Sequence, residues 1–178
     1  MVNLAPDTTK PKGNRLTGAA LVALVVGTVA MVAPTTESEE GKANRAYYDP
    51  AHILTVCYGE TQGIEDRVYS DDECAARLRM RMARDYAPKL IGCVPDFADP
   101  RRQRAFAATL DAAYNAGPAA ACRSPMARAF NAGRWAQGCG AFPGWYVTAR
   151  VNGRPTTLPG LVRRRREEAH FCLTGERA

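Results

Sequence analysis

The apolar run near the N-terminus constrains this chain more than any other feature. Residues 16–33 read LTGAALVALVVGTVAMVA and contain no charged side chain. A helix of this length reaches about 27 Å, slightly less than the hydrocarbon thickness of a bilayer. Cations come before the run and acids follow closely after it: Lys10, Lys12 and Arg15, then Glu37, Glu39 and Glu40. The positive-inside rule therefore predicts a cytoplasmic segment at residues 1–15 and a membrane-spanning segment at residues 16–33, with the rest of the chain on the outer side.

Two interpretations of this run stay open. The small residues of Thr28-Val29-Ala30 suit cleavage of a signal peptide. The length of the run instead favours an uncleaved anchor. Its alanines, glycines and threonines bury little apolar area, and each glycine weakens a helix, so such a span is held only marginally in lipid. We therefore expect a segment that inserts into the membrane and can leave it again.

The remaining chain is long enough for one domain with a core of its own and too short for two. The whole chain has 178 residues, of which 46% are hydrophobic and 24% charged, as is typical of a globular protein. A polar stretch at residues 34–38 predicts a linker, and residues 39–178 then form the domain.

Start and stop signals predict that this domain is mostly helical, with a small sheet near its front. The β-prone letters HILTVCYG at residues 52–59 predict a strand. The capping box Ser70-Asp71-Asp72-Glu73 and three proline-marked starts predict helices over residues 70–86, 99–117 and 124–133, and from residue 159 onward. The predicted fold class is therefore α+β.

The cysteines indicate an oxidising compartment. Six of them are spread over the domain, and no pair has the CxxC spacing of a zinc site: Cys57, Cys74, Cys93, Cys122, Cys139 and Cys172. This even number predicts up to three disulfides, while the spacing selects none of the 15 possible connectivities.

The charge pattern limits the classes of partner. The formal net charge of +6 suits an acidic polymer, whether nucleic acid, anionic lipid or a cell-wall polymer. The basic run at residues 163–166 is followed by Glu167 and Glu168, which favours ion pairs on a solvated helix face over nucleic-acid binding. The sequence also lacks a glycine-rich phosphate loop. We therefore expect no nucleic-acid partner, no metal and no cofactor.

Two carboxylates and a threonine lie close together directly after the apolar run. Glu40 and Asp49 are nine residues apart, and Thr55 lies six residues beyond Asp49. Glycoside cleavage uses such a set, because one acid protonates the leaving oxygen while a second carboxylate orients or activates water. A threonine hydroxyl beside that carboxylate could hold the same water. The spacing alone indicates this chemistry only weakly, since acids on a protein surface often fall at such intervals.

The neighbouring letters carry a resemblance to a known family. Glu40-Gly41, Ala46-Tyr47-Tyr48-Asp49 and Leu54-Thr55-Val56-Cys57-Tyr58-Gly59 resemble the catalytic front of phage-type lysozymes, glycoside hydrolase family 24. That family's pattern is Glu, eight residues, Asp, five residues and Thr, and both spacings match here. The similarity continues downstream and spans residues 39–173, with motifs at Tyr114-Asn115-Ala116-Gly117, Asn131-Ala132-Gly133 and Gly160-Leu161-Val162-Arg163-Arg164-Arg165.

The resemblance implies a lysozyme-like fold: a mostly helical domain with a small antiparallel sheet lobe, preceded here by the N-terminal membrane helix. It implies that Glu40 is the general acid and that Asp49 and Thr55 position the attacking water. The bond cut would be the β-1,4 link between N-acetylmuramic acid and N-acetylglucosamine in bacterial peptidoglycan, for lysis of the host cell and release of phage.

Phage endolysins with a signal-anchor-release segment share this layout, with a weakly apolar helix directly before the catalytic glutamate. The resemblance then implies export by the host secretion machinery and an inactive state tethered to the host inner membrane through residues 16–33. The domain would face the periplasm, be released into it, and act there as a monomer on glycan strands. Some relatives carry a blocking cysteine in the anchor, but residues 16–33 contain none, which disfavours activation by disulfide exchange.

One departure from the family pattern and two alternative functions stay open. Many relatives have histidine after the Tyr-Gly pair, where this chain has Glu60, which is either a third acid near the site or, as we favour, a surface residue. Lytic transglycosylases also use the string AYNAG, found at residues 113–117, and need only one acid, here Glu40. A membrane-anchored wall-binding protein without enzymatic activity would suit the same layout, and a Glu40→Gln change would separate it from an enzyme.

Overall fold

A single long helix carries the apolar run. The computed structural model describes residues 14–49, 51–151 and 153–176, so most of the predicted cytoplasmic segment lies outside the described residues. Helix α1 (Gly18–Glu39) continues through Pro34 and includes residues 34–38, where the sequence predicted a linker. This segment is helical because Thr36 is fully buried against the domain, and its packing outweighs the backbone hydrogen bond lost at the proline.

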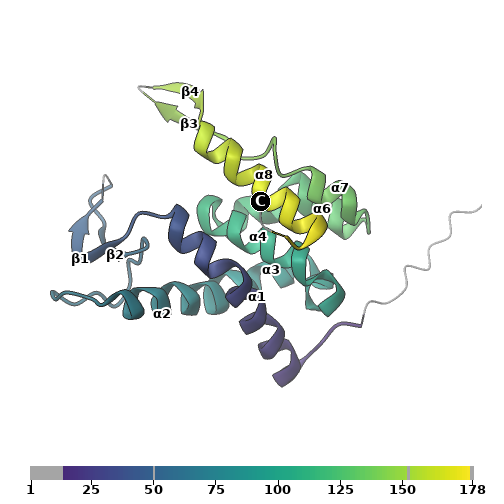
Figure 1. Cartoon of the computed structure of the whole chain (residues 1–178), viewed down its shortest axis with the longest axis horizontal. Helices are drawn as coiled ribbons and strands as arrows, with labels where there is room; N and C mark the ends of the chain where they lie inside the picture. Colours follow the sequence, from purple (N-terminus) through teal and green to yellow (C-terminus); the bar gives the residue numbers. More distant parts are fainter. Residues whose placement is uncertain (1–13, 50, 152, 177–178) are drawn as a thin grey trace, which may run out of the picture.

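One face of α1 forms part of the domain core. The helix packs mainly against the central helix α4 (Gln103–Ala116), and its buried residues recur along its length: Leu24, Thr28, Val29, Val32, Ala33 and Thr36. On the opposite face, Val22 and Val26 are 63% and 58% exposed. Among the described residues, α1 alone has the length and apolar composition needed to cross a membrane. The helix predicted as a membrane span is therefore also a structural element of the folded domain (Figure 1).

The chain just before α1 is tied to the same body. The guanidinium of Arg15 pairs with the Asp96 carboxylate at 2.8 Å. The backbone N–H of Leu16 donates to the Ala98 carbonyl at 2.8 Å. Both partners lie on the short 3-10 helix η2 (Pro95–Ala98), so α1 is held on the body from its first turn onward.

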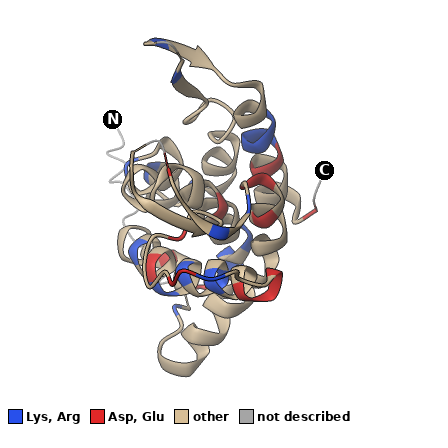
Figure 2. Cartoon of the chain, turned by 90° about the vertical axis from the view of Figure 1, so that its left-hand side faces the viewer, with Lys and Arg blue, Asp and Glu red and all other residues tan. Residues whose placement is uncertain are grey.

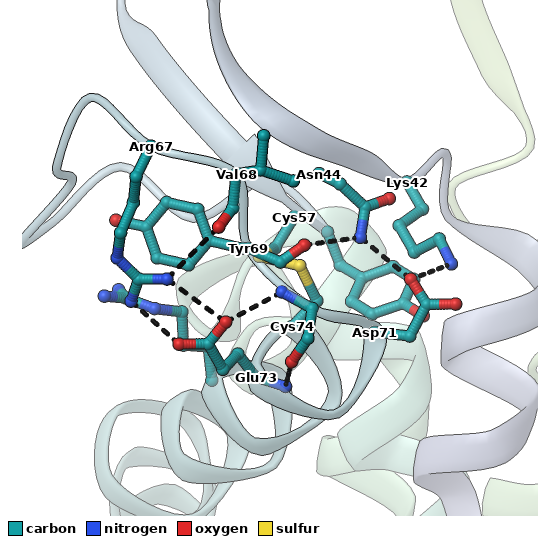
Figure 3. The surroundings of a disulfide bond; sticks show 12 residues. Lys42, Asn44, Cys57, Arg67, Val68, Tyr69, Asp71, Glu73 and Cys74 are labelled. Carbon is teal, nitrogen blue, oxygen red and sulfur yellow. Dashed lines mark hydrogen bonds and ion pairs between the residues drawn. A yellow bond between two sulfur atoms is a disulfide. The ribbon is translucent and has the colours of Figure 1, made fainter.

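A small lobe follows α1. Strands β1 (Ala43–Tyr48) and β2 (Leu54–Cys57) pair antiparallel, and β2 lies within the predicted strand region. The lobe has a small core of its own, made by Val56, Cys57, Tyr69 and Cys74. A disulfide between Cys57 and Cys74 ties β2 to helix α2 (Asp71–Arg81), as Figure 3 shows.

Polar contacts surround Tyr69 and close this lobe (Figure 3). The guanidinium of Arg67 lies 4.0 Å from the centre of the Tyr69 ring and pairs with Glu73 at 2.8 Å. Ser70 and Glu73 form the predicted capping box at the start of α2. The side-chain amide of Asn44 donates to the Tyr69 carbonyl at 2.8 Å, which fixes β1 to the same unit. The lobe therefore supports the hairpin through covalent, ionic and hydrogen-bonded contacts.

One long helical stretch connects this lobe to the helical body. It comprises α2, a π-helical turn η1 (Met82–Tyr86) and α3 (Ala87–Cys93), and so extends beyond the predicted end at residue 86. Pro88 lies in the first turn of α3. Because proline cannot donate a backbone hydrogen bond and its ring crowds the preceding turn, the wider π turn accommodates it within a continuous helix.

The body is built around α4, in which residues 105–113 are all buried. Four more helices follow it in the chain: α5 (Pro118–Cys122), α6 (Pro125–Asn131), α7 (Trp135–Gly140) and α8 (Pro159–Thr174). The predicted start near Asp99 is a 3-10 turn, η3 (Pro100–Arg102), that leads into α4. One disulfide, Cys93–Cys122, joins α3 to α5, and another, Cys139–Cys172, joins α7 to α8. All six cysteines are therefore paired, which confirms the prediction of three disulfides.

A second hairpin projects from the body beside α8 (Figure 1). Strands β3 (Thr148–Val151) and β4 (Arg154–Thr157) pair antiparallel, and all eight of their residues are exposed. The sequence did not predict this hairpin, because strands that bury neither face show no alternation of apolar and polar residues. With its helices and two small sheets, the fold confirms the predicted α+β class.

Candidate active site

Glu40 lies at the C-terminal end of α1, at the junction with the small lobe. Its backbone N–H donates to the Thr36 carbonyl at 3.0 Å, which closes the last turn of the helix. Its side chain is 25% exposed. Carboxylate atom Oε1 accepts a hydrogen bond from Nη1 of Arg164 at 2.8 Å. The predicted acid is thus partly buried, open to solvent on one side, and held from α8.

Arg164 belongs to a buried cluster of charges between α1, α4 and α8. It donates from Nη2 to Oδ1 of Asp111 at 3.0 Å, and its Nε lies 3.5 Å from Oε1 of Glu168. Burial by itself disfavours the cation, but Asp111 and Glu40 outweigh this cost and hold the pKa of Arg164 above its ordinary value. Two arginines in the cluster, Arg164 and Arg165, therefore face three carboxylates.

Arg165 brings two of the sequence motifs together. Its side chain is fully buried, donates to Oδ1 of Asn115 at 2.6 Å and pairs with Glu168. Its guanidinium also lies 5.2 Å from the centre of the Trp145 ring. The asparagine of the YNAG motif thus contacts α8 directly through Arg165. The sequence predicted ion pairs on a solvated helix face. Arg163 is exposed and pairs with Glu39 and Glu167, as expected, whereas Arg164 and Arg165 are buried.

Figure 2 shows the basic segment followed by the acidic one along α8. Glu168 lies in the buried part of that segment and is 4% exposed. Burial, with the nearby Asp111 charge added, raises the pKa of Glu168 to about 8, although Arg165 and Arg164 act against this shift. Its atom Oε2 is buried and has no hydrogen-bond partner among the described residues. Because one oxygen of Glu168 has no donor and the pKa of its carboxyl group is raised, a proton bound by the cluster lies on Glu168.

Asp49 and Thr55 lie on the β1–β2 hairpin. The strand register pairs Tyr47 with Thr55, and the Asp49 N–H donates to the Ile53 carbonyl at 3.0 Å. Asp49 directly follows the end of β1 and lies in the turn of the hairpin, while Thr55 lies on β2 opposite Tyr47. The same hairpin therefore carries both the second carboxylate and the hydroxyl.

Both side chains are fixed by backbone hydrogen bonds. Oδ1 of Asp49 accepts from the N–H groups of Ala51 and Ile53 at 2.8 and 2.9 Å, which shapes the turn of the hairpin. Thr55 is 3% exposed, and its hydroxyl donates to the Ile53 carbonyl at 2.9 Å. No hydrogen bond or ion pair joins Glu40 to Asp49 or Thr55 within the described ranges. The acid and the pair on the hairpin are therefore separate groups.

Tyr114 connects α4 to the small lobe, a role that the sequence motif did not specify. Its hydroxyl donates to the Tyr58 carbonyl at 2.8 Å, and its ring stacks on Tyr86 with centres 5.3 Å apart. Burial raises the pKa of Tyr114 well above its ordinary value, so its hydroxyl remains protonated and able to donate. Arg81 adds a second link by donating to the Gly59 carbonyl at 2.5 Å. These bonds hold the chain just after Thr55.

Glu60, the departure from the family pattern, caps a turn. Its Oε1 atom accepts from the backbone N–H groups of Thr61 and Gln62 at 3.0 and 3.1 Å. Its backbone pairs with that of Val56. Glu60 therefore has a structural role in shaping this turn.

Metal ions in proteins are held mostly by acidic, histidine and cysteine side chains. In the part of the chain that the structure describes, no three of these side chains come close enough to hold a metal ion.

A helical body, a small antiparallel lobe and a glutamate at the end of the helix that joins them define a lysozyme-like domain. The family model of phage lysozyme matches residues 37–168, and the chain belongs to that family. It is a lysozyme-type peptidoglycan hydrolase. The matched range contains all three predicted site residues, the YNAG motif and Arg164.

Individual relatives agree with this assignment. The chain is 29% identical over 158 residues to the SAR-endolysin of Pseudomonas phage phiKMV, covering 89% of this chain and 91% of that protein. Among solved structures, it is similar to the muramidase domain of SpmX from Asticcacaulis excentricus, with a TM-score of 0.67, 25% identity, and coverage of 90% and 99%. It is also similar to the active form of the P1 phage endolysin Lyz, with a TM-score of 0.60, 25% identity, and coverage of 92% and 97%. The similarity to these relatives thus extends over nearly the whole chain.

Proposed function

We propose that this protein is a phage endolysin that hydrolyses the β-1,4 bond between N-acetylmuramic acid and N-acetylglucosamine, with Glu40, Asp49 and Thr55 as its catalytic residues. The observation that carries the proposal is the placement of Glu40 at the end of α1, directly before the hairpin that carries Asp49 and Thr55. Glycosidases use such a pair of carboxyl groups on either side of the bond that is cut.

In this mechanism the protonated Glu40 gives its proton to the leaving glycosidic oxygen as the bond breaks. Water attacks the other side of the sugar. The hydroxyl proton of Thr55 is already donated to the Ile53 carbonyl, so the hydroxyl oxygen is left as an acceptor. A water molecule that donates one hydrogen to Thr55 and the other to Asp49 points its lone pair toward the sugar. Asp49 then takes the proton that this water loses.

The same helix supports regulation by membrane release. Val29, Val32 and Ala33 lie in the predicted membrane span and are buried in the folded domain. These side chains cannot occupy lipid and the domain core at the same time. Because Glu40 directly follows α1, a tethered helix would also remove the acid from its contact with Arg164. The domain therefore completes its active site only after the helix leaves the bilayer.

The cellular setting follows from this proposal and from the likeness to a SAR-endolysin. Host secretion machinery exports the chain, and residues 16–33 tether it to the inner membrane with the domain on the periplasmic side. Release places a monomeric enzyme in the periplasm, where it cuts the glycan strands. The disulfides fit an oxidising compartment of this kind.

The test is a mass spectrum of the sugar ends left when the purified protein digests peptidoglycan. The protein should retain α1, because a chain that begins at residue 34 would lose Val29, Val32 and Ala33 from the core. We expect reducing muramic acid ends from the unchanged protein, and a loss of about a hundredfold to ten-thousandfold in their rate of formation in Glu40→Gln, since this change removes the proton donor.

Other outcomes would contradict the proposal in different ways. Anhydro-muramic ends would identify a lytic transglycosylase and return Asp49 and Thr55 to structural roles. Absence of any cleavage, with equal binding of the wall by the unchanged protein and Glu40→Gln, would identify a wall-binding protein.

A further inference from the structure

Asp111 is a buried acid with no part in the mechanism above. It is 3% exposed and lies on α4, which packs against both α1 and α8. Its atom Oδ1 accepts hydrogen bonds from the hydroxyl of Thr36 at 2.7 Å and from Nη2 of Arg164 at 3.0 Å. A single carboxylate oxygen therefore joins the apolar helix α1 to α8.

The bond to Asp111 determines how Arg164 can hold Glu40. A guanidinium that is free to turn can bind one carboxylate through two parallel hydrogen bonds. Here Nη2 of Arg164 is held by Asp111, so only Nη1 reaches Glu40, and it reaches Oε1 alone. Oε2 of Glu40 has no hydrogen-bond partner in the described part of the chain and is left for the substrate. A proton donor requires this arrangement, because the oxygen that carries the proton must reach the leaving group.

Thr36 supplies the link to the position of α1. Its hydroxyl has two acceptors within reach, Asp111 at 2.7 Å and the Val32 carbonyl at 3.1 Å, but it has only one proton to donate. The shorter bond to a charged acceptor is the stronger one, so the proton goes to Asp111 while α1 is docked. When α1 lies elsewhere, the hydroxyl can return to the Val32 carbonyl of its own helix. The bond between Thr36 and Asp111 therefore exists only in the docked state.

We propose that Thr36 and Asp111 are positioning residues for Glu40. Docking of α1 lets the Thr36 hydroxyl fix Asp111, and Asp111 then holds one arm of Arg164 so that this arginine gives Glu40 a single hydrogen bond. The proposal rests on the assignment of Glu40 as the proton donor. It adds a polar connection between the release of the apolar helix and the geometry of the acid.

The test compares threonine variants of the full chain in solution, with kcat and KM measured on soluble peptidoglycan fragments. Thr36→Val keeps the shape of the side chain and removes the hydroxyl. We expect kcat to fall about tenfold with KM unchanged, the size of effect that follows from losing one hydrogen bond to a charged group. Thr36→Ser keeps the hydroxyl, and we expect it to retain most of the kcat.

Thr28→Val is the matched control. Thr28 is also fully buried on α1, but its hydroxyl donates to the Leu24 carbonyl of the same helix at 2.7 Å and accepts only a long hydrogen bond from the Gln103 side chain at 3.4 Å. We expect this variant to keep the kcat of the unchanged protein. A kcat within twofold of the unchanged protein in Thr36→Val, or an equal loss in both valine variants, would overturn the proposal.

Asp111→Ala tests the next step of the connection. It frees Nη2 of Arg164, and we expect kcat to fall by more than in Thr36→Val. If this variant does not fold, the threonine variants still decide the question. An unchanged protein that forms no sugar ends would contradict the proposed function, whereas unchanged activity in both Thr36→Val and Asp111→Ala would contradict only this inference.

Discussion

At the level of single residues, each side chain assigned to catalysis is held by the protein before any substrate arrives. Asp49 caps the turn of its hairpin, Thr55 donates to the Ile53 carbonyl, and Glu40 accepts from Arg164. Side chains fixed in this way need little reorganisation when the sugar binds, which is how active sites lower the barrier to reaction. The same bonds leave each of the three groups with at least one free lone pair for water or substrate.

Glu168 gives a prediction about pH and stability. Its pKa is raised to about 8 in the folded protein, from an ordinary value of 4.5. Between these two values the folded state holds a proton that the unfolded state releases, so the free energy of unfolding should fall as pH rises from about 4.5 to about 8. We expect urea unfolding to show this decline, and to show a weaker one in Glu168→Gln. A decline of equal size in both proteins would contradict the assignment.

At the level of elements, α8 carries the cluster and is tied to α7 by the Cys139–Cys172 disulfide. These cysteines are 33 residues apart. A bond that closes a loop of this length stabilises a domain by about 4 kcal/mol, chiefly by restricting the unfolded chain. The paired change Cys139→Ala and Cys172→Ala should therefore lower the free energy of unfolding by about that amount in urea titrations without reductant.

A reductant provides the control for this experiment. It should destabilise the unchanged protein more than the variant, because the variant has one disulfide fewer to lose. Equal midpoints of unfolding for the unchanged protein and the variant would contradict a stabilising role for this bond.

The elements also show how far sequence reasoning extends. The capping box at Ser70 and the proline-marked start before α4 predicted their helices, because both signals are local. The helical state of residues 34–38 was not predicted, since it depends on Thr36 packing against α4, which is a contact between distant parts of the chain. The exposed β3–β4 hairpin was also missed, because a strand without a buried face lacks the usual pattern.

The candidate site also contains some residues that the sequence predicted and others that it did not. Glu40, Asp49 and Thr55 were predicted from their spacing and from the family resemblance, and their catalytic roles stay predictions. The buried partners Asp111, Arg164 and Glu168 were not predicted as a cluster. A run of arginines followed by glutamates looks like a solvated face in sequence, and only the packing of α8 against α4 shows that part of it is buried.

At the level of the whole molecule, the proposed function requires one helix to suit two environments. Its buried face matches the core of the domain, and its composition as a whole is apolar enough for a bilayer. The weak hydropathy expected from its alanines and glycines then has a physical use, because a strongly apolar helix would remain in lipid and leave the domain incomplete. The central claim is that the enzyme becomes active only when α1 moves from the membrane to the domain.

A variant that holds α1 in lipid without disturbing the docked fold can test this claim. Four alanines of α1 are exposed in the folded protein: Ala19, Ala20, Ala23 and Ala30. Changing all four to leucine raises the apolar character of the span, while the buried face stays as it is. Changing the same four to serine gives the matched control, which should leave the membrane more readily.

The most direct measurement is the peptidoglycan-cleaving activity of the leucine variant in intact membranes, compared with the same protein after extraction into lipid-free solution. We expect at least a hundredfold less activity in the membrane, full activity after extraction, and no lysis of cells that produce the variant. Equal activity in both preparations would contradict the account, because it would show that the site is complete while α1 still lies in the bilayer.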